Sequence, residues 1–169
     1  ALLLVGFSIF SAITLALTHF RGEHYQGQSV SRIMGLILLL ALSGLQAAHF
    51  AWLYLDQAWV ETMLYRMTLF AVAPAFFLFS QPLLRPQILP AIRPALLWHA
   101  LPIALAPLLP GDLALPLAFI VGAGYLLWLG RSLFLLRHER AGFHQEMLLL
   151  GCVFAIAIGV SAIGLVQAT

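Results

Sequence analysis

Four polar residues within otherwise apolar segments form the most chemically suggestive pattern in the chain: Gln46, His49, Asp56 and Arg66. Gln46 and His49 are three residues apart and Asp56 follows His49 by seven, so the three side chains share one face of a helix. Arg66 lies near the start of the next apolar segment, and we expect it at the same level as His49. The pattern predicts a small polar pocket for an anionic or amphipathic ligand.

Aromatic and acidic residues could complete the mouth of this pocket: Trp52, Tyr54, Trp59, Glu61 and Asp112. Tyrosine and tryptophan are equally typical of the belt where helices meet a membrane interface. Arg66 could also extend to that interface, or pair with Asp56 or Glu61 for purely structural reasons. Both interpretations remain open from the sequence.

Other catalytic or metal-binding arrangements find no support in the residue pattern. His49 and His99 are expected more than about 10 Å apart along the helix axes, too far to share one iron. The chain has no HExxH or CxxC element, and its single cysteine, Cys152, forms no internal disulfide. Ser43 and Ser161 lack the histidine at matching depth that an intramembrane serine protease needs. We expect no enzyme activity, no metal and no cofactor, and interpret Ser43 as a helix-packing hydroxyl.

The composition places these residues in a membrane. Of 169 residues, 63% are hydrophobic and 8% are charged, and the mean hydropathy is +1.02. Soluble domains contain about 45–50% apolar and about 25% charged residues. The composition excludes a soluble enzyme, a secreted disulfide scaffold and a disordered segment, and predicts an all-α polytopic transmembrane bundle.

Apolar segments of roughly 20 residues can cross a bilayer as helices. The sequence offers six candidates, residues 2–18, 33–55, 62–84, 95–109, 113–136 and 147–166, within a single domain over residues 1–169. The fourth is short and contains Pro102 and Pro107, which interrupt helical hydrogen bonding. It could be a kinked helix or a broken, cavity-lining one.

Two further features concern packing and orientation. Gly151, Ala155 and Gly159 recur at four-residue steps, which predicts close helix packing within the bundle or in a dimer. All eight basic residues are arginines, and seven lie in or beside the first, third and fifth connections. The positive-inside rule makes these connections cytoplasmic and places the N-terminus outside. Because both ends of the chain look cut, we expect a seventh helix after Thr169.

Several strings together carry a resemblance to a known family: HFRGEHYQG, LLLALSGLQAAHF, YRMTLFAVAPAFFLF and LPLAFIVGAGYLLWLGRSLFLLRHER. They resemble the N-terminal multi-span membrane sensor region of bacterial membrane-anchored AraC-type (helix-turn-helix) transcriptional regulators. The resemblance implies signal transduction across the bacterial inner membrane, from an outer-side ligand or membrane signal to a cytoplasmic DNA-binding domain. It assigns no ligand residues. The chain contains no helix-turn-helix, so we expect this segment itself to bind no nucleic acid.

Two alternatives to the sensor hypothesis stay open. A non-catalytic accessory or assembly subunit of a larger inner-membrane complex would also carry small packing residues and no catalytic groups. A small transporter could use the interrupted fourth segment as a gate. The expected partners are the lipid bilayer, a small ligand at the outer face, and a homodimer or larger membrane complex.

Overall fold

The computed structural model describes residues 29–84 and 94–136, together with the isolated residues 6, 9, 10, 13, 14 and 148. All regular structure in this part of the chain is helical. Three helices are long: α2 (Ser29–Leu55), α3 (Met63–Leu84) and α5 (Gly111–Leu135). Four elements are short: η3 (Trp59–Glu61), η4 (Pro94–Ala100), α4 (Leu101–Leu105) and η5 (Ala106–Leu108). The all-α prediction is confirmed for the described residues.

Helices α2, α3 and α5 are each long and apolar enough to cross a membrane. They confirm the predicted segments 33–55, 62–84 and 113–136, with α2 beginning four residues earlier than expected. The predicted segments 2–18 and 147–166 lie outside the described residues, and so do Gly151, Ala155 and Gly159. The described part of the chain therefore contains helices at three of the six predicted segments, each long and apolar enough to cross a membrane.

The fourth predicted segment, 95–109, is not one continuous α-helix. It is divided into η4, α4 and η5, and only five of its residues are α-helical. Pro102 lies in the first turn of α4 and Pro107 in the first turn of η5. Because proline lacks an N–H donor and clashes with the preceding turn, each one starts a new short segment rather than extending the previous one.

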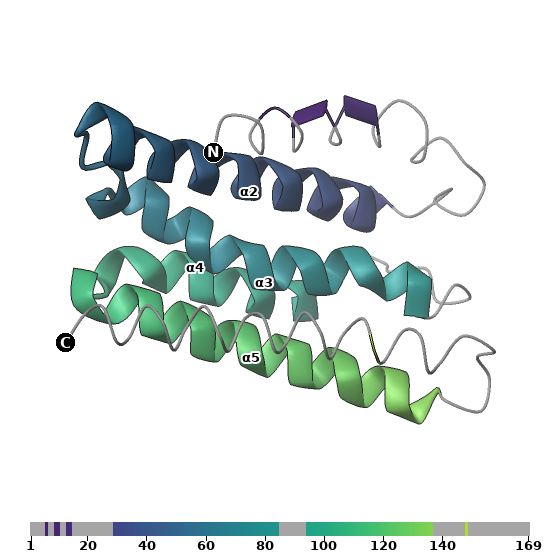
Figure 1. The fold of residues 1–169 in the computed structure, drawn as a ribbon. Helices are drawn as coiled ribbons and strands as arrows, with labels where there is room; N and C mark the ends of the chain where they lie inside the picture. The colour runs from purple at the N-terminus through teal and green to yellow at the C-terminus, as the bar shows by residue number, and fades with distance from the viewer. Residues whose placement is uncertain are drawn as a thin grey trace.

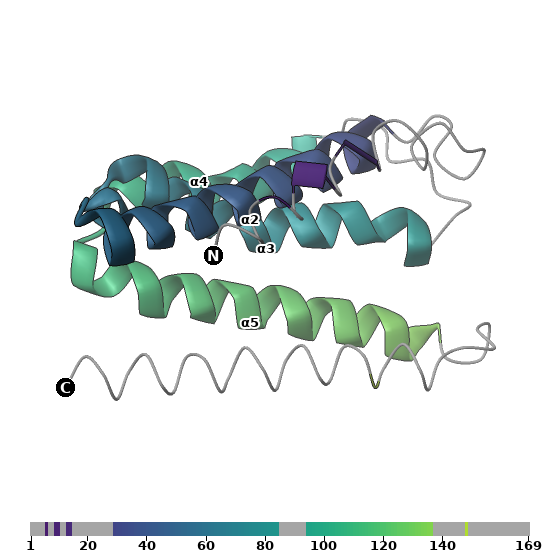
Figure 2. The ribbon, with the colours of Figure 1, turned by 45° about the horizontal axis from the view of Figure 1, so that its top comes forward.

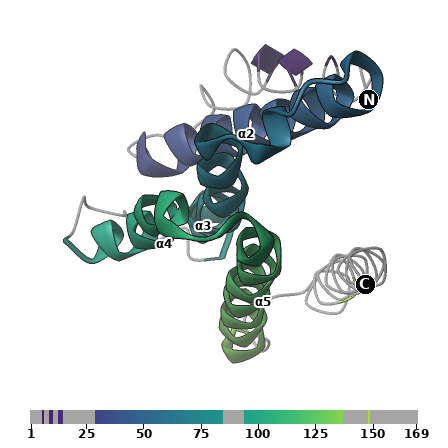
Figure 3. The same ribbon diagram turned by 90° about the vertical axis from the view of Figure 1, so that its left-hand side faces the viewer.

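Helix α3 lies at the centre of the described bundle (Figures 1 and 3). Helix α2 packs along one side of α3, while α4, η5 and α5 contact another side. Helices α3 and α5 run in the same direction, and α2 runs opposite to both (Figures 1 and 2). One end of the bundle, at the left of Figure 1, therefore gathers the end of α2 and the starts of α3 and α5. We call it the Arg66 end.

Acidic and basic side chains lie mostly at opposite ends of the described bundle. The described acidic residues all lie at the Arg66 end: Asp56, Glu61 and Asp112. Arg32 lies in the first turn of α2 and Arg131 near the end of α5, which places both at the opposite end. Arg66, in the first turns of α3, is the exception to this separation.

Small side chains let α2 approach α3 closely. Ala41, Ala48 and Ala51 are buried on α2, and the buried hydroxyl of Ser31 donates to the carbonyl of Leu78 on α3 at 3.1 Å. On its other side, α3 buries Phe70 against Ala106 and Ala114, and buries Phe77 against Leu129 and Leu133, the residues of two separate apolar clusters. Helix α3 is therefore packed on both sides.

Candidate functional site

Arg66 is a half-buried cation in the first turns of α3. Its Nη1 donates a hydrogen bond of 2.6 Å to the carbonyl oxygen of Leu109, which ties α3 to the residue after η5. Its Nε is buried and has no hydrogen-bond partner. A buried donor without a partner costs about 1–3 kcal/mol, and an arginine has five N–H donors to satisfy. The guanidinium is therefore anchored at one point while its hydrogen-bonding capacity is only partly used.

A cavity of about 560 Å³ lies beside Arg66, between the starts of α3 and α5. Its charged lining comes from Arg66, Glu61 and Asp112. The uncharged lining residues are Val60, Tyr65, Leu69, Gly111, Ala114 and Leu115. Within residues 29–84 and 94–136, no ion pair joins Arg66 to either carboxylate. The cavity therefore presents a cation and two carboxylates that do not neutralise one another by direct contact.

His49 contacts the residue next to Arg66. Its Nε2 and the hydroxyl of Tyr65 share a hydrogen bond of 3.0 Å, with the rings edge to face at 5.7 Å between centroids. Since Tyr65 and Arg66 are consecutive, the expected common level of His49 and Arg66 is confirmed. Consecutive helical residues point about 100° apart, so Tyr65 faces α2 while Arg66 faces η5 and α5.

Gln46 and Asp56 lie apart from the Arg66 cavity. Helix α2 ends at Leu55, and Asp56 has a left-handed φ of 51°, so Asp56 does not continue the helical face of Gln46 and His49. The N–H of Gln57 then donates to the carbonyl of Ala51 at 3.1 Å, which closes the helix end. Gln46 is half-buried on α2.

The four predicted site residues are thus divided between two places. Arg66 lines the cavity with Glu61 and Asp112, whereas Gln46, His49 and Asp56 do not line it. His49 only contacts Tyr65, which does line it. Glu61 and Asp112 were expected only at the rim. The ligand-binding role of Gln46, His49, Asp56 and Arg66 stays a prediction.

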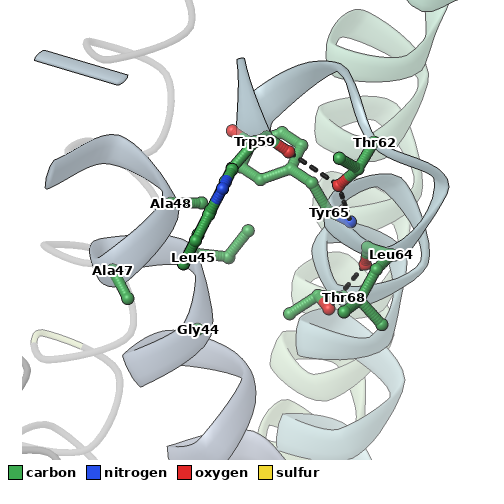
Figure 4. A pocket seen from close by; sticks show the side chains of 9 residues that line it. All are labelled: Gly44, Leu45, Ala47, Ala48, Trp59, Thr62, Leu64, Tyr65 and Thr68. Carbon is green, nitrogen blue, oxygen red and sulfur yellow. Dashed lines mark hydrogen bonds between the residues drawn. The ribbon is translucent and has the colours of Figure 1, made fainter. Parts of the chain in front are cut away.

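A second, apolar pocket of about 400 Å³ lies between α2 and the start of α3 (Figure 4). Gly44, Leu45, Ala47 and Ala48 line it from α2, and Trp59, Thr62, Leu64, Tyr65 and Thr68 line it from the other side. The indole of Trp59 extends toward α2 (Figure 4). Trp59 therefore faces this apolar pocket, where no charged group is available, and does not line the Arg66 cavity.

Thr62 sets the direction of the first turn of α3. Its hydroxyl donates to the carbonyl of Trp59 at 2.7 Å and accepts the N–H of Tyr65 at 3.2 Å (Figure 4). A threonine that accepts an N–H three residues later caps the helix start and stabilises it by about 1 kcal/mol. The cap fixes the first turn of α3, and with it the directions in which the side chains of Tyr65 and Arg66 project. A threonine followed by a long apolar run is the sequence signal that could have identified it.

An aromatic cluster far from Arg66 was not predicted from the sequence. Nδ1 of His99 and the hydroxyl of Tyr125 share a hydrogen bond of 2.8 Å. Phe77 packs against both rings and against Trp128, with 4.6 Å between the Phe77 and Trp128 centroids. The cluster joins η4, α3 and α5. The three-residue spacing of Tyr125 and Trp128 on α5 was the signal available for it.

The described residues contain no group of three histidine, cysteine, aspartate or glutamate side chains that could hold a metal ion. Ser43 donates to the carbonyl of Leu39, one turn earlier on α2, at 2.8 Å. Such a bond satisfies the hydroxyl within its own helix, as expected for a serine at a helix-packing position. Ser161 lies outside the described residues.

Comparison with known proteins gives no relative from which a site could be transferred. No protein-family model, curated protein or solved structure matches the chain. The assignment of function therefore depends on the Arg66 cavity itself.

Proposed function

We propose that this chain is the sensory membrane domain of a one-component transcriptional regulator in the bacterial inner membrane. It is a multi-pass, non-catalytic bundle that passes an outer-side signal to a cytoplasmic DNA-binding domain. The six spans and the N-terminus outside belong to this proposal. The observation that carries it is Arg66, a partly bonded cation within an apolar helix, lining a cavity.

A charged side chain within a membrane-spanning helix is unfavourable by a few kcal/mol on insertion scales, and such residues usually have a functional role. Arg66 lies in α3, which is long and apolar enough to span a membrane. Among the described residues, the Arg66 side chain makes one hydrogen bond, to Leu109, which leaves donors for a ligand. A polar ligand group would supply the missing acceptor.

The position of the cavity supports a signalling role. Its lining comes from η3, α3 and α5, so a bound ligand would contact two of the long helices at once. A ligand shifts a conformational equilibrium when it binds one helix arrangement better than another. Ligand binding at the Arg66 end would then change the packing of α3 against α5, and α5 runs to the opposite, arginine-bearing end.

The native chain tests this proposal in its own host. We expect the protein isolated from host membranes to exceed 18.5 kDa and to contain helix-turn-helix peptides. Deleting the gene and replacing Arg66 by Met should alter transcripts of the same small set of genes. The control Ile120→Ala, at a side chain 66% exposed on α5, should leave them unchanged. A native mass near 18.5 kDa with no transcriptional change would overturn the proposal.

A non-catalytic accessory subunit is the second candidate, and one observation favours it. Leu113, Ile120 and Leu127 form an exposed apolar row at seven-residue spacing on α5, which suits a partner helix as well as lipid. Co-purification of one fixed partner in stoichiometric amount, lost on charge substitution of Ile120, would favour this candidate over the sensor.

A further inference from the structure

The Arg66 cavity carries both signs of charge without pairing them. Glu61 belongs to η3, Arg66 to α3 and Asp112 to the first turn of α5, and all three line the same space. No ion pair within 4.0 Å joins Arg66 to Glu61 or Asp112 among the described residues. Opposite charges that face a common space, rather than each other, can each interact with a different group of one ligand.

A ligand of a single charge would fit this lining poorly. A simple anion would bind the Arg66 guanidinium but would approach two carboxylates of like charge. A simple cation would be attracted to Glu61 and Asp112 but repelled by Arg66. At similar distances, each unfavourable contact is comparable in strength with each favourable one, so a ligand of one charge gains little.

One hydrogen bond fixes where the positive charge of Arg66 lies in the cavity. The Leu109 carbonyl holds Nη1 at 2.6 Å and so directs the guanidinium toward the η5–α5 connection. The starts of α3 and α5 add the positive ends of two helix dipoles at the same end of the bundle. Glu61 and Asp112 are both exposed and lie beside these helix starts. Charge alone would therefore bring an anionic ligand group to Arg66 and a cationic group to Glu61 and Asp112.

We propose that the Arg66 cavity binds a small zwitterion. Its anionic group, a phosphate or carboxylate, accepts hydrogen bonds from Arg66, and its ammonium group lies beside Glu61 and Asp112. This inference rests on the proposed sensory site and names its ligand class. The same chemistry occurs in the headgroup of a phosphatidylethanolamine lipid and in soluble zwitterions, and the cavity of about 560 Å³ has room for either group.

The first test compares a zwitterion with its two halves. The full chain is placed in phosphatidylglycerol nanodiscs and titrated calorimetrically with glycerophosphoethanolamine, glycerol 3-phosphate and ethanolamine. We expect the zwitterion to bind at least tenfold more tightly than either half. Equal affinity for glycerol 3-phosphate and the zwitterion would overturn the zwitterion inference, although an anion site at Arg66, and with it the proposed function, would stand.

Variants that remove one charge type test which residues bind the anionic group of the ligand and which bind its ammonium group. Arg66→Met should lower zwitterion affinity at least tenfold and abolish glycerol 3-phosphate binding. The double variant Glu61→Gln with Asp112→Asn should keep glycerol 3-phosphate binding but lose the preference for the zwitterion. If the double variant retains that preference, the ammonium does not lie beside these carboxylates and the inference fails.

A steric variant tests the location without altering any charge. A Cβ added at Gly111 meets nothing within 4 Å, and Gly111 lines the cavity, so Gly111→Leu should fold and reduce zwitterion binding at least tenfold. Gly124→Leu is the matched control, because a Cβ there also meets nothing within 4 Å but Gly124 lies farther along α5, outside the cavity. Equal binding by the two leucine variants would place the ligand elsewhere.

A titration in nanodiscs with a second lipid distinguishes a lipid headgroup from a soluble zwitterion as the ligand. Phosphatidylethanolamine added to the nanodiscs should weaken the apparent affinity for the soluble probe if the site takes a lipid headgroup. An unchanged affinity identifies a soluble zwitterion as the ligand class. Absence of binding by all three probes would overturn the inference, and the transcriptional response of Arg66→Met would then decide the proposed function separately.

Discussion

Two polar clusters on α3 make an instructive comparison. At the Arg66 end, the exposed ring of His49 contacts Tyr65, and Arg66 makes one hydrogen bond beside an open cavity. Beside a later part of α3, the half-buried His99 of η4 contacts Tyr125 of α5 within a set of packed aromatic rings. Each cluster contains a histidine–tyrosine hydrogen bond between helical elements, yet only the first is next to unpaired charges and space.

The difference follows from what surrounds each pair. Phe77 is 5% exposed and its ring lies within 5.5 Å of those of His99, Tyr125 and Trp128, so that cluster holds α3, η4 and α5 together. At the Arg66 end, the exposed ring of His49 meets Tyr65 edge to face. We infer that the aromatic cluster serves stability and that the Arg66 end serves binding, and this contrast can be tested by substitution.

Phe77→Ala should have the largest effect on stability. It removes a buried ring that contacts three others, and a buried phenylalanine replaced by alanine typically lowers the free energy of unfolding by about 3–5 kcal/mol. Unfolding in detergent micelles with increasing dodecyl sulfate measures the change. Ile120→Ala, at an exposed position of α5, is the control and should change it by less than about 0.5 kcal/mol. A small effect of Phe77→Ala would remove the contrast between the clusters.

Asp56→Val should cost about 1–2 kcal/mol of unfolding free energy, because a β-branched residue is strained at the φ of 51°. Asp56→Gly should be neutral, since glycine adopts positive φ without strain. The same unfolding measurement serves both variants. If Asp56→Gly abolishes the transcriptional response while Asp56→Val and Asp56→Gly are equally stable, the carboxylate acts in binding and not in the turn.

The two histidine–tyrosine bonds can be compared directly. Tyr125→Phe should lower the free energy of unfolding by about 1 kcal/mol, since hydrogen bonds between membrane helices contribute about 0.6 and at most about 1.7 kcal/mol. Tyr65→Phe removes the bond to the exposed His49 and should cost less than about 0.5 kcal/mol. The reverse order would show that the Arg66 end is the more important for stability.

Arg66→Met should change the free energy of unfolding by less than about 1 kcal/mol. The loss of the Leu109 hydrogen bond is offset by removal of a buried, unpartnered Nε and by an apolar side chain of similar length. Ligand response should nevertheless be lost. Unfolding of the Arg66→Met variant under conditions where the wild type is folded would make Arg66 a structural residue.

Much of the architecture was predictable from the sequence because length and hydrophobicity are local properties. The segments 33–55, 62–84 and 113–136 agree with α2, α3 and α5 to within a few residues. The interruption of segment 95–109 was foreseeable from Pro102 and Pro107, but its division into η4, α4 and η5 depends on which backbone groups find partners.

The composition of the site was less predictable. The sequence placed His49 and Arg66 at a common level, since helical rise converts residue number into depth. It did not determine that Tyr65, and not Arg66, meets His49, because this depends on the rotation of α3 about its axis. The Thr62 cap and the packing of Phe70 and Phe77 against α5 and its neighbours set that rotation.

The sequence by itself determined that the chain is helical and apolar, that acidic side chains lie at one end of its described helices, and that Arg66 lies within a long apolar segment. Only the tertiary structure decided which residues share the arginine's cavity. Glu61 and Asp112 come from elements 51 residues apart and meet beside Arg66 because α3 and α5 start at the same end of the bundle. Residue spacing along one helix determines which side chains share a face. Contacts between helices depend on the rotation of each helix about its axis, which tertiary packing sets.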